Sequence, residues 1–144
     1  MKESDIPQAI YATIIELLGD KARQKQNGDI TIGGKSKHPI YITFFNEEKK
    51  SFRIKLWIGE LTDELQMKAA EECCVRLNTT LYLTKLAIEK KGRKYGLCAI
   101  IDHKCYTQSE VGKFIPFAKM IIVSDGINAI NFMNEKVGQL KNAL

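Results

Sequence analysis

The sequence predicts an α+β fold in which one antiparallel sheet of about five strands has helices on one of its faces. Apolar and polar residues alternate in several short segments, most clearly over residues 51–59, and a period of two is typical of strands. Segments with helical apolar spacing stand at both ends and in the middle of the chain. The strand-like segments mostly follow one another directly, which leaves too few strand–helix–strand units for a doubly wound fold. The expected order of elements is α-β-β-β-α-β-β-α.

The composition is that of one globular domain, which we expect to include residues 1–144. Of the 144 residues, 44% are hydrophobic and 27% are charged, and a chain of this length buries enough surface to need no disulfide or metal. No apolar run approaches the ~20 residues of a membrane span. The first 20 residues lack the pattern of a signal peptide, because Thr13 and Glu16 interrupt their apolar residues. We therefore expect a soluble, cytoplasmic protein with no membrane partner.

The first helix is expected over residues 5–18. Ser4 or Asp5 can cap its N-terminus, because a short polar side chain accepts hydrogen bonds from the first free N–H groups of a helix. Pro7 suits the first turn, where its missing N–H has no helical partner. Gly19 offers a left-handed stop at the C-terminal end.

Strands are expected to follow this helix. Asn27–Gly28 is a turn signal before a short alternating strand at residues 29–33, and residues 22–26 can pair back on it as an edge strand. A loop then leads to an alternating strand at residues 40–45. The polar segment 46–50 joins that strand to the one at residues 51–58.

The last two of these strands form a predicted hairpin whose register follows from parity. Opposed residues in an antiparallel pair have position numbers with a constant sum, and the apolar faces coincide only if that sum is even. A turn centred on Glu48 satisfies this condition and predicts three apolar pairs, namely Phe44–Phe52, Ile42–Ile54 and Ile40–Leu56. The other face then has the pairs Tyr41–Lys55, Thr43–Arg53, Phe45–Ser51 and Pro39–Trp57.

The next helix is expected to begin with Thr62 as its N-cap and to end at Asn78. A strand is expected at residues 81–88. Its alternation of apolar and polar residues shifts by one position near Thr84, which indicates either a bulge or a late strand start. After a turn at residues 90–94, the strand at residues 95–101 is apolar on both faces, as is typical of an interior strand.

The C-terminal part of the chain predicts a long helical tract that runs to about Val137. Thr107 and Glu110 have the spacing of a capping box at its start. Pro116 either begins this helix or kinks it. A break near Ser124–Asp125 is a further alternative, because β-branched residues and Gly126 flank that point.

Three parts of the chain together resemble a known family. They are residues 44–57, a helix of small residues that ends at residues 76–78 and the hairpin at residues 81–101, and a last long helix follows them. Their pattern and order resemble the type III secretion chaperone-like fold and, more narrowly, the YbjN-like family of bacterial sensory-transduction regulators, over about residues 5–137. The resemblance implies a homodimer that binds extended segments of other proteins without ATP. Secretion chaperones of this kind are typically acidic, whereas this chain has a net charge of +5.

The basic residues gather in three clusters, at residues 21–25, 35–38 and 90–94. A positive net charge attracts nucleic acids and acidic partners. The alternative function is therefore nucleic-acid binding through these clusters. The competing explanation is that each cluster is a solvated loop or helix end.

We expect no metal or other cofactor. The four cysteines, Cys73, Cys74, Cys98 and Cys105, contain no pair with the C-x-x-C spacing of zinc sites, and we expect reduced, mostly buried thiols. The segment His103–Cys105 can supply two ligands and Cys98 a third, but this spacing is not that of a structural zinc site.

The sequence also predicts that the protein is not an enzyme. His38 and His103 are expected to be exposed polar residues. Residues 102–105 include an acid, an imidazole and a thiol, but catalytic triads are assembled in space, so neighbouring positions in the sequence do not indicate one. Residues 33–36 lack the first glycine and the following helix of a phosphate loop. The carboxylates at residues 47–48 and 71–72 are expected to be solvated.

The face that bears Trp57 is the predicted partner-binding surface. It combines aromatic and cationic side chains, which are enriched at interfaces. Its residues are Tyr41, Phe45, Arg53, Lys55 and Trp57. Two alternatives are that the last helix covers this face, or that the aromatic residues pack under the loop at residues 33–39. The predicted function is a non-enzymatic protein-binding module, chaperone-like or regulatory, that acts as a homodimer.

Overall fold

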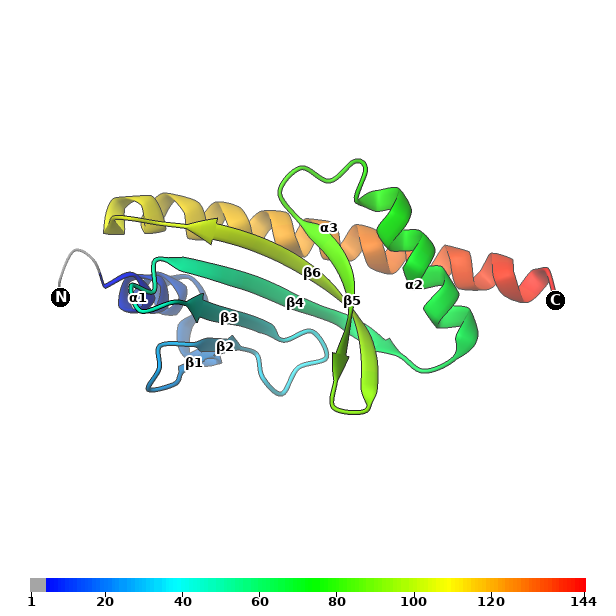
Figure 1. Ribbon diagram of the computed structural model, residues 1–144, viewed down its shortest axis with the longest axis horizontal. Helices are drawn as coiled ribbons and strands as arrows, with labels where there is room; N and C mark the ends of the chain where they lie inside the picture. Colours follow the sequence, from blue (N-terminus) through cyan, green and yellow to red (C-terminus); the bar gives the residue numbers. More distant parts are fainter. Residues whose placement is uncertain (1–4) are drawn as a thin grey trace.

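The computed structural model describes residues 5–144 and has three helices against one six-stranded antiparallel sheet (Figure 1). The helices are α1 (Ile6–Leu18), α2 (Glu64–Leu77) and α3 (Gln108–Asn142), and a 3₁₀ turn, η1 (Gly19–Lys21), follows α1. The strands are β1 (Ala22–Gln24), β2 (Ile30–Ile32), β3 (Ile40–Phe45), β4 (Ser51–Leu61), β5 (Lys85–Lys91) and β6 (Lys94–Lys104). The predicted α+β class is confirmed. The sixth strand is the edge strand β1, which pairs back on β2.

The sheet has the order β1-β2-β3-β4-β6-β5, and all neighbours are antiparallel. The register between β3 and β4 is the predicted one, with Phe44 opposite Phe52 and Ile42 opposite Ile54. The pairing continues past the end of β3, because the Trp57 N–H donates to the carbonyl oxygen of Pro39 at 3.0 Å. The parity argument therefore identified both faces of this hairpin correctly.

β1 and β2 are shorter than predicted by two residues each, and three further strands differ more in extent. β4 continues to Leu61 through a register shift between Trp57 and Gly59. β5 begins at Lys85, later than expected, so the shift in the apolar–polar alternation near Thr84 marks the start of the strand. A tight turn at Gly92, with φ of 64°, joins β5 to β6, and β6 extends to Lys104.

All three helices cover one face of the sheet. The clearest contact is at Gly126 of α3, where an added Cβ would lie 2.7 Å from Cδ2 of Leu56 on β4. α1 packs against α3 at the β1–β3 side, and α2 packs against α3 and β5. One hydrophobic core lies between the sheet and the helices, and its largest fully buried apolar side chains are Phe52, Ile6, Ile10, Ile30, Leu97, Ile101, Ile122 and Val111.

The ends of α1 and α2 show how local side chains define the helices. Asp5 caps α1 by accepting a hydrogen bond from the Gln8 N–H at 3.3 Å, and the other predicted cap, Ser4, lies outside the described residues. The predicted cap of α2 was wrong. Asp63 is the N-cap, accepting from the Gln66 N–H at 2.8 Å. Thr62 instead donates its N–H and its hydroxyl to Oε1 of Gln66, so the helix begins one residue later.

α3 is one continuous helix of 35 residues that spans the long dimension of the molecule (Figure 1). Its predicted capping box is present, because Thr107 Oγ1 accepts from the Glu110 N–H at 3.2 Å and Glu110 accepts from the Tyr106 N–H at 3.1 Å. Pro116 lies inside the helix, and the helix has no break near Ser124. It continues past Val137 to Asn142 as a largely exposed end in which only Leu140 is half-buried.

Candidate functional site

The five predicted site residues all lie on the sheet face opposite the helices. Tyr41 and Phe45 come from β3, and Arg53, Lys55 and Trp57 come from β4. Successive strand side chains alternate between faces, so the odd-numbered residues of both strands share this side. We call these five residues the strand face. No helix within residues 5–144 covers it, which excludes the alternative that the last helix does so.

The two cations of the strand face are paired within the chain. Arg53 donates to both carboxylate oxygens of Asp102, at 2.7 and 3.0 Å, and this hydrogen bond lowers the pKa of Asp102. Lys55 forms an ion pair with Glu89. Each pair links β4 to another strand of the sheet, so the structure already neutralises both charges.

The aromatic residues of the strand face also have partners within the chain. Lys91 donates from Nζ to the Tyr41 hydroxyl at 2.9 Å and lies 4.9 Å from the centre of that ring. It also lies 5.8 Å from the Trp57 ring. The Trp57 indole packs on Gly96 of β6, where an added Cβ would be 2.1 Å from Cη2. Trp57 is therefore a half-buried packing residue that covers β6.

The cysteines are free thiols, and three of them are buried. Burial raises the pKa of Cys73 and of Cys98 to about 12, and that of Cys105 to about 11. Cys74 is half-buried, and burial raises its pKa as well. A thiol needs a lowered pKa to act as a nucleophile at neutral pH, so these environments favour inert thiols.

His103 is not the exposed residue that the sequence predicted. Its ring stacks on Phe114 of α3 with a centroid distance of 3.6 Å and an angle of 5°. It also meets the ring of Phe52 edge-on at 6.1 Å. Burial lowers the pKa of His103, which favours the neutral imidazole. The residue therefore closes the core at the end of β6, whereas His38 is exposed as expected.

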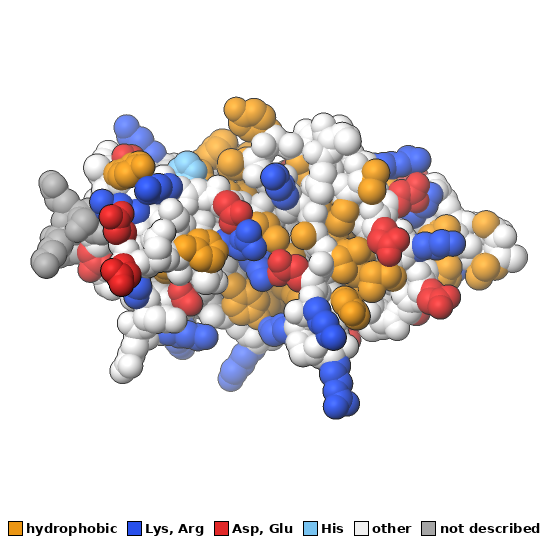
Figure 2. All heavy atoms as spheres, viewed as in Figure 1, with side chains coloured by type: hydrophobic (Ala, Val, Ile, Leu, Met, Phe, Trp, Pro, Cys, Tyr) orange, Lys and Arg blue, Asp and Glu red, His pale blue; other side chains and the backbone are white. Residues whose placement is uncertain are grey.

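The basic cluster at residues 21–25 overlaps the edge strand β1, the one at residues 35–38 lies in the β2–β3 loop, and the one at residues 90–94 forms the β5–β6 turn. The last cluster reaches the strand that follows the β2–β3 loop, because its Lys91 contacts Tyr41 of β3. Figure 2 shows basic side chains protruding along the lower margin and charges of both signs elsewhere on that face. Within residues 5–144, no group of three or more His, Cys, Asp or Glu side chains is placed to hold a metal ion. No helix in the same part of the chain is long and apolar enough to cross a membrane.

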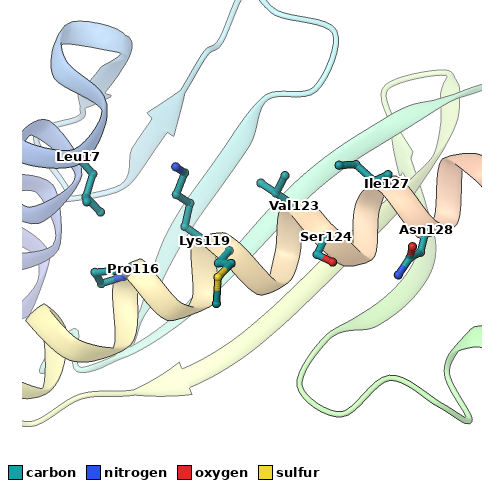
Figure 3. A pocket seen from close by; sticks show the side chains of 8 residues that line it. Leu17, Pro116, Lys119, Val123, Ser124, Ile127 and Asn128 are labelled. Atoms are coloured by element: carbon teal, nitrogen blue, oxygen red, sulfur yellow. The ribbon is translucent and has the colours of Figure 1, made fainter.

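A second surface, which the sequence did not reveal, lies on the helical side. An open groove of about 580 Å³ runs between the end of α1 and α3 (Figure 3). Its lining residues are Leu17 of α1 and Pro116, Lys119, Met120, Val123, Ser124, Ile127 and Asn128 of α3. We call this surface the helix groove. Figure 3 shows Leu17 projecting from α1 towards α3, so the groove has one wall on each helix.

The helix groove exposes large apolar side chains. Met120 is 62% exposed and Ile127 is 54% exposed, and both stand on the side of α3 away from the buried Ile122. α3 therefore has two apolar stripes on opposite sides, one buried against the core and one exposed. The signal that was missed is that a 35-residue helix over a small sheet has more apolar residues than one face can bury. This exposed apolar patch makes the helix groove a candidate binding surface.

The comparisons with known proteins support the fold alone. No protein-family model matches the chain, and no curated protein matches it. Among solved structures, the chain is similar to the Yersinia pestis type III secretion chaperone SycH, solved in complex with a stable fragment of YscM2. The TM-score is 0.51 at 13% sequence identity, and the match covers 88% of this chain and 98% of that chain. The expected likeness to the type III secretion chaperone fold is thus confirmed.

Proposed function

We propose that this protein is a non-enzymatic, chaperone-like or regulatory module that acts as a homodimer and binds a segment of another protein. The observation that supports this proposal most is the helix groove, an exposed apolar surface on a fold that resembles a partner-binding chaperone. Membership of the YbjN-like family is part of the same proposal.

The chemistry of the groove suits protein binding. Met120, Val123 and Ile127 leave apolar surface in water, and covering that surface is favourable by about 25 cal/mol per Å². Ser124 and Asn128 add polar groups to the lining, which a partner's polar side chains can reach with hydrogen bonds. The lining has no thiol, imidazole or carboxylate that would favour a reaction.

The strand face remains the second proposed surface. Phe45 is its most exposed aromatic residue, at 41%, and lies at the end of β3. A partner that bound across Tyr41 and Lys55 would compete with the contacts that these residues make to Lys91 and Glu89. The helix groove has no such competing contacts among its apolar side chains, so we place the main partner site there.

The test is an affinity capture from native lysate at low salt and at about 0.5 M salt, with bound protein and nucleic acid both quantified. Attraction between exposed charges is largely screened at the higher salt concentration. The baits are the wild type, Met120→Glu in the helix groove and Trp57→Ala at the strand face. Val75→Glu is the matched control, because Val75 is 71% exposed on α2 and lies outside both surfaces. Any captured protein is identified, purified and titrated against each bait by calorimetry, and light scattering gives the mass of the free bait.

We expect a purified partner that binds the wild type and the Val75→Glu control but not Met120→Glu. Loss with Trp57→Ala instead would move the site to the strand face. A bait that retains only nucleic acid, and only at low salt, would replace the proposal with nucleic-acid binding through the basic clusters. A monomeric mass for the free wild type would remove the homodimer from the proposal.

A further inference from the structure

We infer that the helix groove is built for an amphipathic helix of a partner protein whose apolar stripe is flanked by carboxylates. This inference rests on the proposed function and adds the conformation and charge of the bound segment. Two independent properties of the groove lead to it: the secondary structure of its walls and the charge of its lining.

The walls favour a helix over an extended segment. Both are helices, α1 and α3, whose backbone groups are largely hydrogen-bonded within each helix. An added strand needs a row of free N–H and C=O groups, and such rows exist only at sheet edges. A helix satisfies its own backbone and needs only apolar contacts. The groove offers those contacts and no sheet edge.

The spacing of the exposed side chains also matches helix packing. Met120, Val123 and Ile127 follow one another at intervals of three and four, so they form one ridge along α3. From Pro116 to Ile127 the ridge is about 17 Å long, which equals three turns of a docked helix. Leu17 on α1 stands near Pro116, at the N-terminal end of this ridge (Figure 3), so a helix laid along the ridge also contacts α1 at that end.

The lining has a single charged residue, which is the cation Lys119. In the part of the chain that the structure describes, no carboxylate forms an ion pair with it. Lys113, further towards the N-terminus of α3, is exposed and likewise has no ion pair there. Glu16 precedes Leu17 in the chain but does not line the groove. An incoming carboxylate therefore finds an unneutralised ammonium beside the apolar ridge.

A second copy of this chain fits the groove less well. Its own helix groove would bring another Lys119 to the interface and no carboxylate from the lining. The groove therefore favours a different protein with an acidic helix, and the proposed homodimer uses another surface.

The inference is tested with two designed, fluorescein-labelled, helix-forming peptides of about five turns each. Both have the same leucine stripe, flanked by glutamates in one peptide and by lysines in the other. Binding is measured by fluorescence anisotropy at low and high salt, and peptide helicity by circular dichroism. The protein variants are wild type, Lys119→Glu, Met120→Glu and the Val75→Glu control, each checked for an unchanged melting temperature.

We expect the wild type to bind the glutamate peptide about tenfold more tightly than the lysine peptide at low salt, with a smaller ratio at high salt. Lys119→Glu should reverse the preference, Met120→Glu should abolish binding of both peptides, and Val75→Glu should change neither. The bound peptide should gain helicity. This pattern would support a helical, acidic partner segment.

Three results would overturn the inference. Equal affinity for both peptides would contradict the inferred preference for carboxylates. Binding without a gain in peptide helicity would contradict the inferred helical conformation of the bound segment. A change of the protein's own mass in Met120→Glu would identify the groove as a self-interface. If neither peptide binds while a purified lysate partner still depends on Met120, the inference fails and the proposed function stands. If no lysate partner that depends on Met120 is found either, both the inference and the proposed function fail.

Discussion

The six-membered ring of the Trp57 indole covers Gly96 so closely that a Cβ on Gly96 would lie 2.1 Å from Cη2 and 2.2 Å from Cζ2 of the ring. Trp57 stands on β4 and Gly96 on β6, so the contact joins two neighbouring strands on the face without helices. Cys98, directly opposite Trp57, is completely buried. The only tryptophan of the chain therefore stands among charged residues because it fills the space that Gly96 leaves open.

Gly96→Ala should destabilise the protein by about 1–3 kcal/mol, because the new Cβ must displace a rigid ring. Urea denaturation of purified protein measures the change. Gly138→Ala is the matched control, since a Cβ there has no atom within 4 Å, and it should be neutral or slightly stabilising. In a Trp57→Ala background the Gly96→Ala change should be nearly neutral. An equal loss in both backgrounds would show that the indole is not the cause.

Thr84→Val should stabilise the protein by about 1 kcal/mol. Thr84 is only 2% exposed, and its Oγ1 has no hydrogen-bond partner within residues 5–144. Valine has nearly the same shape without the hydroxyl, so it removes the unpaired buried group. Thr84→Ser, which keeps the hydroxyl and loses the methyl, should destabilise. A shift of the urea midpoint in the opposite direction for Thr84→Val would mean that the hydroxyl has a partner in solution, such as an ordered water.

Asn78→Ala should destabilise the protein by about 1–2 kcal/mol, because two hydrogen bonds are lost together. The Asn78 amide donates to the Leu86 carbonyl at 2.9 Å and accepts from the Leu86 N–H at 2.7 Å. The Asn78 side chain thus satisfies backbone groups of Leu86 that a neighbouring strand would otherwise bond, because β5 is an edge strand. Asn78→Asp keeps the acceptor but faces the Leu86 carbonyl with a charge, so it should destabilise more. The exposed Asn131→Ala on α3 is the control in thermal melts.

Stability should fall as the pH rises above about 9. Burial raises the pKa of Cys73 and Cys98 to about 12 in the folded protein, from the ordinary value of 9.0. Between these values the unfolded chain releases thiol protons that the folded chain keeps, so alkali favours unfolding. The contribution is complete below pH 9 and is lost as the pH rises towards 12. Urea denaturation at pH 8 and pH 10 measures the effect, and Cys98→Ala should reduce the pH dependence.

The same thiols should react in a fixed order with iodoacetamide at pH 8. Cys74 is the half-buried one and should react first, and Cys73, Cys98 and Cys105 should react only after urea unfolds the protein. Mass spectrometry of tryptic peptides gives the order. Fast reaction of Cys105 in the folded protein would contradict its raised pKa of about 11 and reopen a catalytic role.

Local patterns determined much of the fold. The hairpin register followed from the position numbers of Phe44 and Phe52 alone, because strand side chains alternate with period two. The start of α3 followed from Thr107 and Glu110, whose side chains bond to backbone groups within one turn. Thr62 was misjudged as a cap because two adjacent residues, Thr62 and Asp63, can both serve, and only the observed bonds to Gln66 distinguish them.

The candidate site depended on contacts that no local pattern contains. The sequence by itself determined which residues share the strand face, since that needs only the strand period. Tertiary structure decided that Trp57 packs on Gly96, that α3 continues through Pro116, and that Met120 and Ile127 remain exposed. The physical reason is that burial depends on which distant segment lies opposite a side chain. Neighbours along the chain define turns, caps and strand faces, whereas packing between segments decides which apolar stripe is left for a partner.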